Sequence, residues 1–180
     1  ALDEKQILEQ RKEIEKVNKK INGIKVLQGI EVNIDADGKP DMPDKVLKGF
    51  DVVVGSIHSG FKNSKEVITK RMIKAMENEN VDIIGHPTGR LIFKREPYEI
   101  DLDVVFDAAK RTGTIMEINS YPERLDLKDS NARAAVQKGV KLVISTDAHS
   151  AEQLNFIRFG IGTARRGWVA KNDVINTRSL

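Results

Sequence analysis

Residues 141–150 have the sequence KLVISTDAHS, an apolar run followed by a polar exit. The branched apolar residues at 142–144 are typical of a buried strand in a parallel sheet. Asp147 and His149 follow, and alternate residues of an extended chain share a face, so we expect both side chains to point the same way. A carboxylate beside an imidazole can bind a metal or pair an acid with a base, whereas a solvated strand end with an Asp helix cap is the structural alternative.

Similar segments recur along the chain. Apolar runs that end in polar residues predict further strands over residues 24–34, 50–58, 81–87 and 114–120. Helical periodicity and capping residues predict helices over residues 44–48, 64–78, 102–112 and 130–138. Strand and helix therefore alternate every 25 to 30 residues or so, about the spacing of βα units around a parallel sheet. The expected fold class is α/β.

Both ends of the chain carry further predicted elements. Residues 2–21 predict an amphipathic helix with one buried apolar face, made by Ile7, Leu8, Ile14, Val17 and Ile21. Near the C-terminus, residues 161–168 predict a short strand and Asn172 caps a last helical turn. Residues 35–40, DADGKP, start like a calcium-binding loop but lack its closing Glu, which favours a plain turn.

Length and composition bound the classes of protein. The 180 residues predict one domain, residues 1–180. There is no Cys, which excludes disulfides, Cys-ligated zinc and a thiol nucleophile and favours a cytoplasmic protein. No apolar run approaches the roughly 20 residues of a membrane span. The chain begins with ALDEKQ rather than Met, which predicts a piece of a longer protein, and its net charge of +3 permits an anionic partner without implying nucleic acid.

The chain has three histidines, His58, His86 and His149, and each falls at the carboxyl end of a predicted strand. In α/β sheets and barrels this is the face where ligand and catalytic groups meet. With Glu31 and Asp147, which lie near the ends of their own strands, they predict one polar site. Imidazole and carboxylate without thiolate suit zinc, manganese or iron. Any one of these residues alone is equally compatible with a hydrogen-bonded surface position.

Six segments resemble one known family. They are GIEVNI at 29–34, DVVVGSIHSGF at 51–61, GHPTGR at 85–90, EINSYPERLDL at 117–127, STDAHS at 145–150 and FGIGTARRGW at 159–168. Together they resemble the polymerase and histidinol phosphatase (PHP) domain, above all the version at the C-terminus of bacterial and archaeal family X DNA polymerases. The resemblance covers nearly the whole chain. It implies a distorted α/β barrel of seven strands, similar to a TIM barrel, with a cluster of up to three metal ions.

The resemblance also implies a role for each residue of the predicted site. Glu31 is expected to be a bridging carboxylate that binds one metal together with His58 and His86, while Asp147 binds a second metal and His149 a third. The family pattern begins with about two strands and four further ligands that have no counterpart from Ala1 onward. We therefore expect an incomplete barrel, about one tightly held metal ion, and exposed edges through which two copies could associate.

The implied chemistry is hydrolysis of phosphoesters, because clustered divalent metals lower the pKa of bound water and stabilise charge on phosphate oxygens. For a polymerase module, the resemblance implies a manganese-favoured 3′-5′ exonuclease or 3′-phosphatase that trims DNA ends in repair. A nucleotidyltransferase domain would precede it in the same chain, and this piece alone would be weakly active or inactive. The alternatives are a stand-alone small-molecule phosphatase, such as a histidinol phosphatase, and a noncatalytic module of a polymerase.

Several polar side chains are candidates for contacts with the substrate. The basic ones can donate hydrogen bonds to phosphate, although loop cations are often only solvated; they are Arg90, Lys94, Arg95, Arg165 and Arg166. Asn119 and Tyr121 are further pocket candidates. Glu117 shares a strand face with Asn119, yet we expect it to face the helices.

Overall fold

A computed structural model describes residues 4–178 of the chain, so residues 2 and 3 of the predicted first helix lie outside the described part. Its α-helices are α1 (Glu4–Asn18), α2 (Asp44–Leu47), α3 (Lys65–Met76), α4 (Leu102–Thr112), α5 (Asp129–Gln137) and α6 (Ile157–Arg166). Its strands are β1 (Gly29–Asn33), β2 (Val52–Ser56), β3 (Ile83–Ile84), β4 (Ile115–Asn119) and β5 (Leu142–Ser145). Short 3-10 turns follow at η1 (Ala151–Phe156), η2 (Lys171–Asp173) and η3 (Ile175–Thr177).

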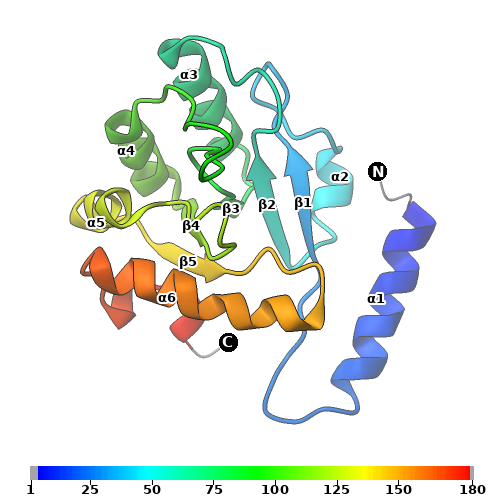
Figure 1. Cartoon of the computed structure of the whole chain (residues 1–180). Coiled ribbons are helices and arrows are strands. Elements are labelled where there is room, and N and C mark those ends of the chain that lie inside the picture. The colour runs from blue at the N-terminus through cyan, green and yellow to red at the C-terminus, as the bar shows by residue number, and fades with distance from the viewer. Residues whose placement is uncertain (1–3, 179–180) are drawn as a thin grey trace.

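The five strands form one parallel sheet in the order β1-β2-β3-β4-β5 (Figure 1). All five strands predicted from the sequence up to residue 149 are confirmed, as is the α/β class. Because each strand pairs with the next one along the chain, the sheet has the progression of a barrel wall. β1 and β5 are its two edges, and within the described residues the sheet does not close on itself.

Helices cover the sheet in the same sequential order, with α3 against α4, α4 against α5, and α5 against α6. In α3 the buried residues Ile68, Met72, Ala75 and Met76 recur at helical spacing and pack into the core, so the methionines fill the interior as predicted. Met116 and Ile118 of β4 and Phe106 of α4 are almost fully buried in the same cluster. Each such side chain contributes about 1.5–3 kcal/mol of hydrophobic stabilisation.

Two predicted helix signals have the expected geometry. Ser64 Oγ accepts the N–H of Val67 at the start of α3, and Asp101 accepts the N–H of Val104 at the start of α4. A side-chain cap of this kind stabilises a helix by about 1 kcal/mol. α4 ends at Gly113, whose φ of 80° is favourable only without a Cβ.

The predicted strand at 161–168 is wrong, because α6 occupies most of this segment. Its buried residues Gly160, Thr163 and Ala164 are small and lie three and four residues apart, which suits a helix in close contact with the sheet. A Cβ on Gly160 would lie 2.0 Å from Ser120 Oγ. Asn172 is not a cap either, since Asp173 accepts the Ala170 N–H at the start of η2.

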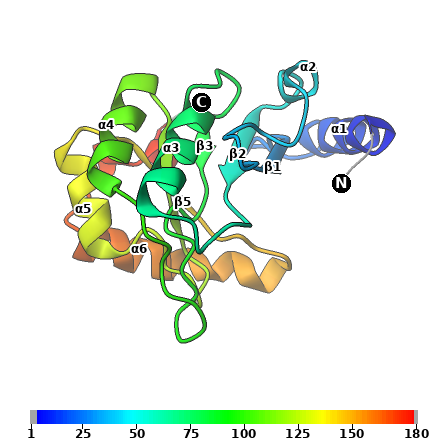
Figure 2. The ribbon, with the colours of Figure 1, turned by 90° about the horizontal axis from the view of Figure 1, so that it is seen from above.

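α1 is a helix as predicted, but its apolar side is not a buried face. Figures 1 and 2 show it standing to one side of the sheet, beyond α2 and β1. Leu8 is 61% exposed and Val17 is 41% exposed. The helix is attached largely by polar contacts, including Arg11 Nη1 to Asp51 Oδ2 at 2.7 Å.

None of the helices in the described part of the chain combines the length and the apolar character needed to cross a membrane.

Candidate metal centre

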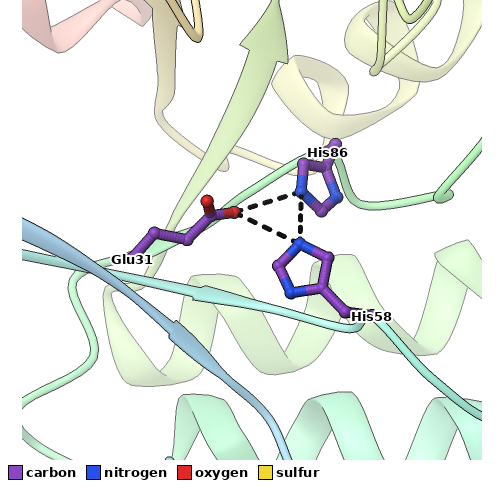
Figure 3. Close-up of side chains that lie close together, drawn as sticks. All are labelled: Glu31, His58 and His86. Carbon is purple, nitrogen blue, oxygen red and sulfur yellow. Dashed lines mark hydrogen bonds and ion pairs between the residues drawn. The ribbon is translucent and has the colours of Figure 1, made fainter. Parts of the chain in front are cut away.

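Three side chains from three adjacent strands meet at the carboxyl edge of the sheet (Figure 3). Glu31 lies within β1, while His58 and His86 each lie two residues beyond the ends of β2 and β3. Glu31 Oε1 is 3.1 Å from His86 Nε2 and 3.6 Å from His58 Nε2, and the two Nε2 atoms are 3.3 Å apart. Parallel pairing in register brings these positions, far apart in the sequence, to one place.

The geometry fits a metal ion. Ligand atoms at about 2.0–2.1 Å from a tetrahedral ion are separated from one another by roughly 3.3 Å. The three observed separations, 3.1, 3.3 and 3.6 Å, lie around this value. One carboxylate and two imidazoles are also a donor set that zinc, manganese and iron accept.

Hydrogen bonds around the cluster leave His58 ready to act as a ligand. Asn33 Nδ2 donates to Asp41 Oδ2 at 2.6 Å, which turns Asn33 Oδ1 toward His58 Nδ1 at 2.5 Å. Nδ1 therefore donates its hydrogen to Asn33, and the lone pair of Nε2 faces the cluster.

The protonation states of the cluster also favour metal binding. The hydrogen bond from His86 is the main cause that lowers the pKa of Glu31 to about 2, so the carboxylate is ionised near neutral pH. Burial lowers the pKa of His58, which favours its neutral form. Because metal binding displaces protons from ligands, the ionised Glu31 and the neutral His58 reduce the free energy that binding costs, whereas the hydrogen that His86 Nε2 donates to Glu31 has to leave before Nε2 can bind an ion.

Glu117 positions the backbone of His86, and the prediction that it faces the helices is wrong. Its Oε2 accepts the His86 N–H at 2.5 Å, and its Oε1 accepts the hydroxyl of Ser145. Met116 and Ile118 of the same strand pack in the core, so alternation places Glu117 and Asn119 on the opposite face, where the ligands lie. Burial raises the pKa of Glu117.

Asp147 and His149 are not part of the three-residue cluster among the described residues. β5 ends at Ser145 and Asp147 has a φ of 51°, so the strand alternation that predicted a shared face does not reach them. Asp147 Oδ2 accepts a hydrogen bond from Asn119 Nδ2 at 3.3 Å, and the charge of Asp147 acts to raise the pKa of His58. His149 is exposed, with Nδ1 hydrogen-bonded to the backbone oxygen of Asp147 at 2.7 Å.

Arg124 is a residue of this site that the sequence reasoning missed. Its Nε lies 3.5 Å from Asp147 Oδ2, its charge contributes to the low pKa of His58, and its buried Nη1 has no partner among the described residues. Arg124 was visible within the quoted segment EINSYPERLDL, as a cation in the loop after a strand end. A cation beside the Asp147 carboxylate and close enough to act on His58 can donate hydrogen bonds to an anionic ligand.

Two of the other candidate cations, Arg90 and Arg166, have local partners. Arg90 donates from Nε to Arg124 O at 2.7 Å and from Nη2 to Leu125 O, so it ties two loops together. Arg166 pairs with Asp129 at 2.9 Å, and Arg165 is exposed on α6. Roles for these residues in substrate binding stay predictions.

Lys94, Arg95 and Tyr121 likewise have local contacts. Lys94 pairs with Glu123 at 2.8 Å, and Arg95 Nε donates to Gly89 O at the same distance. The ring of Tyr121 meets that of Phe156 edge-on.

Comparison with known proteins shows which proteins the chain is similar to. No family model matches it. It is 44% identical over 180 residues to the DNA polymerase/3′-5′ exonuclease PolX of Bacillus subtilis (strain 168), which covers all of this chain and 32% of that protein. It is 34% identical over 168 residues to a probable phosphatase of Thermoanaerobacter sp. (strain X514), which covers 88% of this chain and 66% of the relative. The chain thus spans about a third of one relative and about two thirds of the other.

The fold is also known. A crystal structure of histidinol phosphate phosphatase from Lactococcus lactis, in complex with zinc, L-histidinol and phosphate, matches with a TM-score of 0.62 and 18% identity. The match covers 91% of this chain and 75% of that one. With the sequential parallel sheet and with relatives that are PolX and phosphatases, these likenesses show that the chain belongs to the polymerase and histidinol phosphatase (PHP) family.

Proposed function

We propose that this chain is the metal-dependent phosphoesterase module of a family X DNA polymerase and that it trims 3′ ends of DNA as an exonuclease or 3′-phosphatase. The observation that carries the proposal is the convergence of Glu31, His58 and His86 at ligand spacing. The 44% identity to a DNA polymerase/3′-5′ exonuclease supports the polymerase context. In this context a nucleotidyltransferase domain belongs to the same protein, which works on DNA in the cytoplasm.

The residues of the chain divide into those that hold the ion and those that meet the substrate. Glu31, His58 and His86 hold one divalent ion, zinc, manganese or iron, which supplies a hydroxide nucleophile and stabilises phosphate oxygens when bound. Arg124 and Asn119 lie beside Asp147 and can donate hydrogen bonds to phosphate oxygens. We assign Asp147 and His149 to further ions, as in the family pattern, and Arg90, Arg165 and Arg166 to contacts with the nucleic acid.

The experiment that tests the proposal measures metal content and hydrolysis together. Purified chain is dialysed against zinc or manganese, analysed for metal, and assayed on a 3′-tailed DNA duplex and on a 3′-phosphorylated one. We expect about one tightly held ion per chain and slow, metal-dependent release of nucleotide or phosphate. His86→Ala should abolish this release. Two or three stoichiometric ions would contradict the assignment of a single tight site, and release that persists in His86→Ala would contradict the catalytic centre.

A small-molecule phosphatase is the second candidate, because the 34% identity to a probable phosphatase extends over 88% of the chain. Histidinol phosphate and p-nitrophenyl phosphate in the same assay distinguish the two. Faster turnover of these compounds than of DNA ends would favour the second candidate. Metal binding without hydrolysis of any substrate, even in the longer protein, would instead indicate a noncatalytic module.

A further inference from the structure

A cavity of about 790 Å³ lies beneath the connection between β3 and α4. It is distinct from the metal centre, because Glu31, His58 and His86 do not line it. It nevertheless adjoins the centre, since Thr88, two residues beyond His86, forms part of its wall. A ligand in the cavity would therefore approach the edge of the sheet at which the three ligands converge.

The lining of the cavity favours an anion. Lys65, Arg95 and Lys128 contribute cationic side chains, and Arg90 adds a fourth, against the two carboxylates of Glu96 and Glu99. Lys65 and Leu102 are the first residues of α3 and α4, and Lys128 is at the cap position of α5. The positive ends of three helix dipoles thus add to the side-chain charge.

Two of these cations keep donors for a ligand. Arg95 uses Nε for Gly89 O, and its terminal nitrogens make no hydrogen bond within residues 4–178. Lys128 has no ion pair in the same range. Phosphate groups are the anions that a set of dispersed Lys and Arg side chains binds best.

The aromatic ring of Phe93 lies at this cavity, and both its exposure and its backbone conformation are unusual. Phe93 lines the cavity, is fully exposed to solvent at 104%, and has a φ of 63°, which is rare for a bulky residue. Figure 2 shows the connection that carries it projecting from the body of the molecule as a green loop. A flat apolar ring presented to water by a strained backbone suggests a binding role.

The loop that carries Phe93 is held in place on both sides. Leu91 and Arg95 exchange two backbone hydrogen bonds of 2.8 Å, and the Ile92 N–H donates to Glu123 O at 2.6 Å. At its base the Tyr98 hydroxyl donates to Pro87 O at 2.8 Å, and a Cβ on Gly89 would lie 2.4 Å from the Tyr98 ring. The backbone of the loop is therefore held in place before a ligand binds, which lowers the entropy lost on binding.

We propose that this cavity binds a single-stranded segment of nucleic acid, with a base stacked on Phe93 and the adjoining phosphates held by Arg95 and Lys128. An aromatic platform beside a cationic groove is the arrangement that binds single strands without sequence preference. The inference rests on the proposed function, because it gives the strand whose 3′ end reaches the metal centre a place to bind. A purely apolar protein partner fits the site less well, since it would leave the cations unpaired.

The test measures binding without metal, so that it does not depend on hydrolysis. The chain in EDTA is titrated into a 5′-fluorescein oligothymidylate, and fluorescence anisotropy gives the affinity. An oligonucleotide of equal length with abasic sites, which keeps the phosphates, and a blunt duplex serve as comparison ligands. Phe93→Ala and Phe93→Leu remove the π face, Phe93→Trp keeps it, and Phe159→Ala on α6 is a matched control that is also exposed.

We expect Phe93→Ala and Phe93→Leu to weaken binding about tenfold, and Phe93→Trp and Phe159→Ala to leave it within about twofold. Lys128→Gln should reduce the slope of log affinity against log salt by about 0.7, whereas Lys12→Gln on α1 should not change it. Abasic and duplex ligands should bind more weakly than the single strand. Because Phe93 is fully exposed, the Phe93 variants should melt at the temperature of the wild type.

Equal affinity for the abasic ligand, or unchanged binding by Phe93→Leu, would overturn the proposal. So would a Phe93→Ala variant that alters self-association of the free chain in sedimentation and leaves oligonucleotide binding intact. Failure here is separable from failure of the proposed function. If hydrolysis is lost in His86→Ala but unaffected by substitution of Phe93, the proposed binding of a single strand in this cavity is wrong and the phosphoesterase function stands. If binding depends on Phe93 but no hydrolysis is detected, the binding site stands and the phosphoesterase function is wrong.

Discussion

The two groups of predicted ligands differ in how the chain positions them. Glu31, His58 and His86 belong to β1, β2 and β3, whose register aligns Glu31 with Val54 and Val54 with Ile83. Asp147 and His149 instead follow β5 in a loop, where local hydrogen bonds orient them. A sheet brings distant residues together with little freedom, whereas the conformation of a loop sets its own side chains. The first group therefore forms a preorganised site on its own, and the second requires further partners.

Removal of one member of the first group should have the largest effect. His86 is 3% exposed and contacts both other ligands, so His86→Ala should abolish stoichiometric metal binding by this chain. The loss should exceed the roughly 10- to 100-fold typical of an outer-shell change. Metal analysis after dialysis and titration calorimetry measure it. His149→Ala is the matched control, and a site that is equally impaired by both would contradict the contrast between the groups.

The second group should matter only where its partners are present. In the longer protein, which we expect to contain the remaining ligands, His149→Ala should reduce metal content and hydrolysis steeply while the melting temperature stays nearly unchanged. The reason is that His149 is exposed and supports little of the core. Turnover equal to that of the wild type would show that His149 is an ordinary surface residue and not a metal ligand.

Substitution of Glu117 tests whether its hydrogen bonds to His86 and Ser145 hold the first group in place. Glu117→Ala leaves the His86 N–H and the Ser145 hydroxyl without their acceptor, so we expect a loss of about 2–3 kcal/mol in the free energy of unfolding. Urea denaturation of the metal-free chain measures this. Glu123→Ala, which removes a surface ion pair with Lys94, should cost less than about 1 kcal/mol. Similar losses for both variants would show that Glu117 is not a structural support.

Much of the fold was predictable from the sequence, because the spacing of apolar residues indicates strands and helices and because capping residues indicate where helices begin. Apolar runs ending at His58 and His86 predicted β2 and β3, and Ser64 and Asp101 predicted the starts of α3 and α4. α6 was missed although its sequence is amphipathic at the helical period and Ile157 packs against the core, because Gly160 and Gly162 are poor helix formers. Small residues mark close packing only once the partner is known.

The site was accessible to a lesser degree. The shared position at strand ends predicted one site of five residues, and the resemblance to the PHP family grouped Glu31 with His58 and His86. Strand register brings these three together because it does not depend on side-chain detail. Arg124 and Asp147 lie in loops, where a positive φ or a single hydrogen bond redirects a side chain. The position of Glu117 was predictable, because alternation along the strand from the buried Met116 places Glu117 on the face of the ligands.

Acidification should separate the contributions of the ligands. The folded chain lowers the pKa of His58 from 6.5 and that of Glu31 from 4.5 to about 2. The unfolded chain therefore binds these protons more readily, so both contributions to stability are present above pH 6.5 and are lost stepwise on acidification. For the metal-free chain, we expect a melting temperature that falls below pH 6.5 and again below 4.5. Glu31→Gln should make the second decrease smaller, because other carboxyls with a lowered pKa, such as those of Asp35 and Asp51, still contribute to it. A second decrease of unchanged size would contradict the assignment.

The smallest effect should come from the partner that orients His58. Asn33→Ala removes the acceptor of His58 Nδ1 but leaves the ring at the end of β2, so metal affinity should fall about tenfold, the low end for a lost outer-shell partner. Titration with zinc measures it, with Asn155→Ala as an exposed control. Asn33→Asp keeps an acceptor at the same place and should restore affinity while raising the pKa of His58.

The outcome bears directly on the contrast between the two groups. His149 Nδ1 bonds to a backbone oxygen, so its orientation depends on the loop and on no single partner side chain. If Asn33→Ala leaves zinc affinity unchanged, strand position alone orients His58. If Asn33→Ala abolishes binding, the first group is as dependent on local hydrogen bonds as the second.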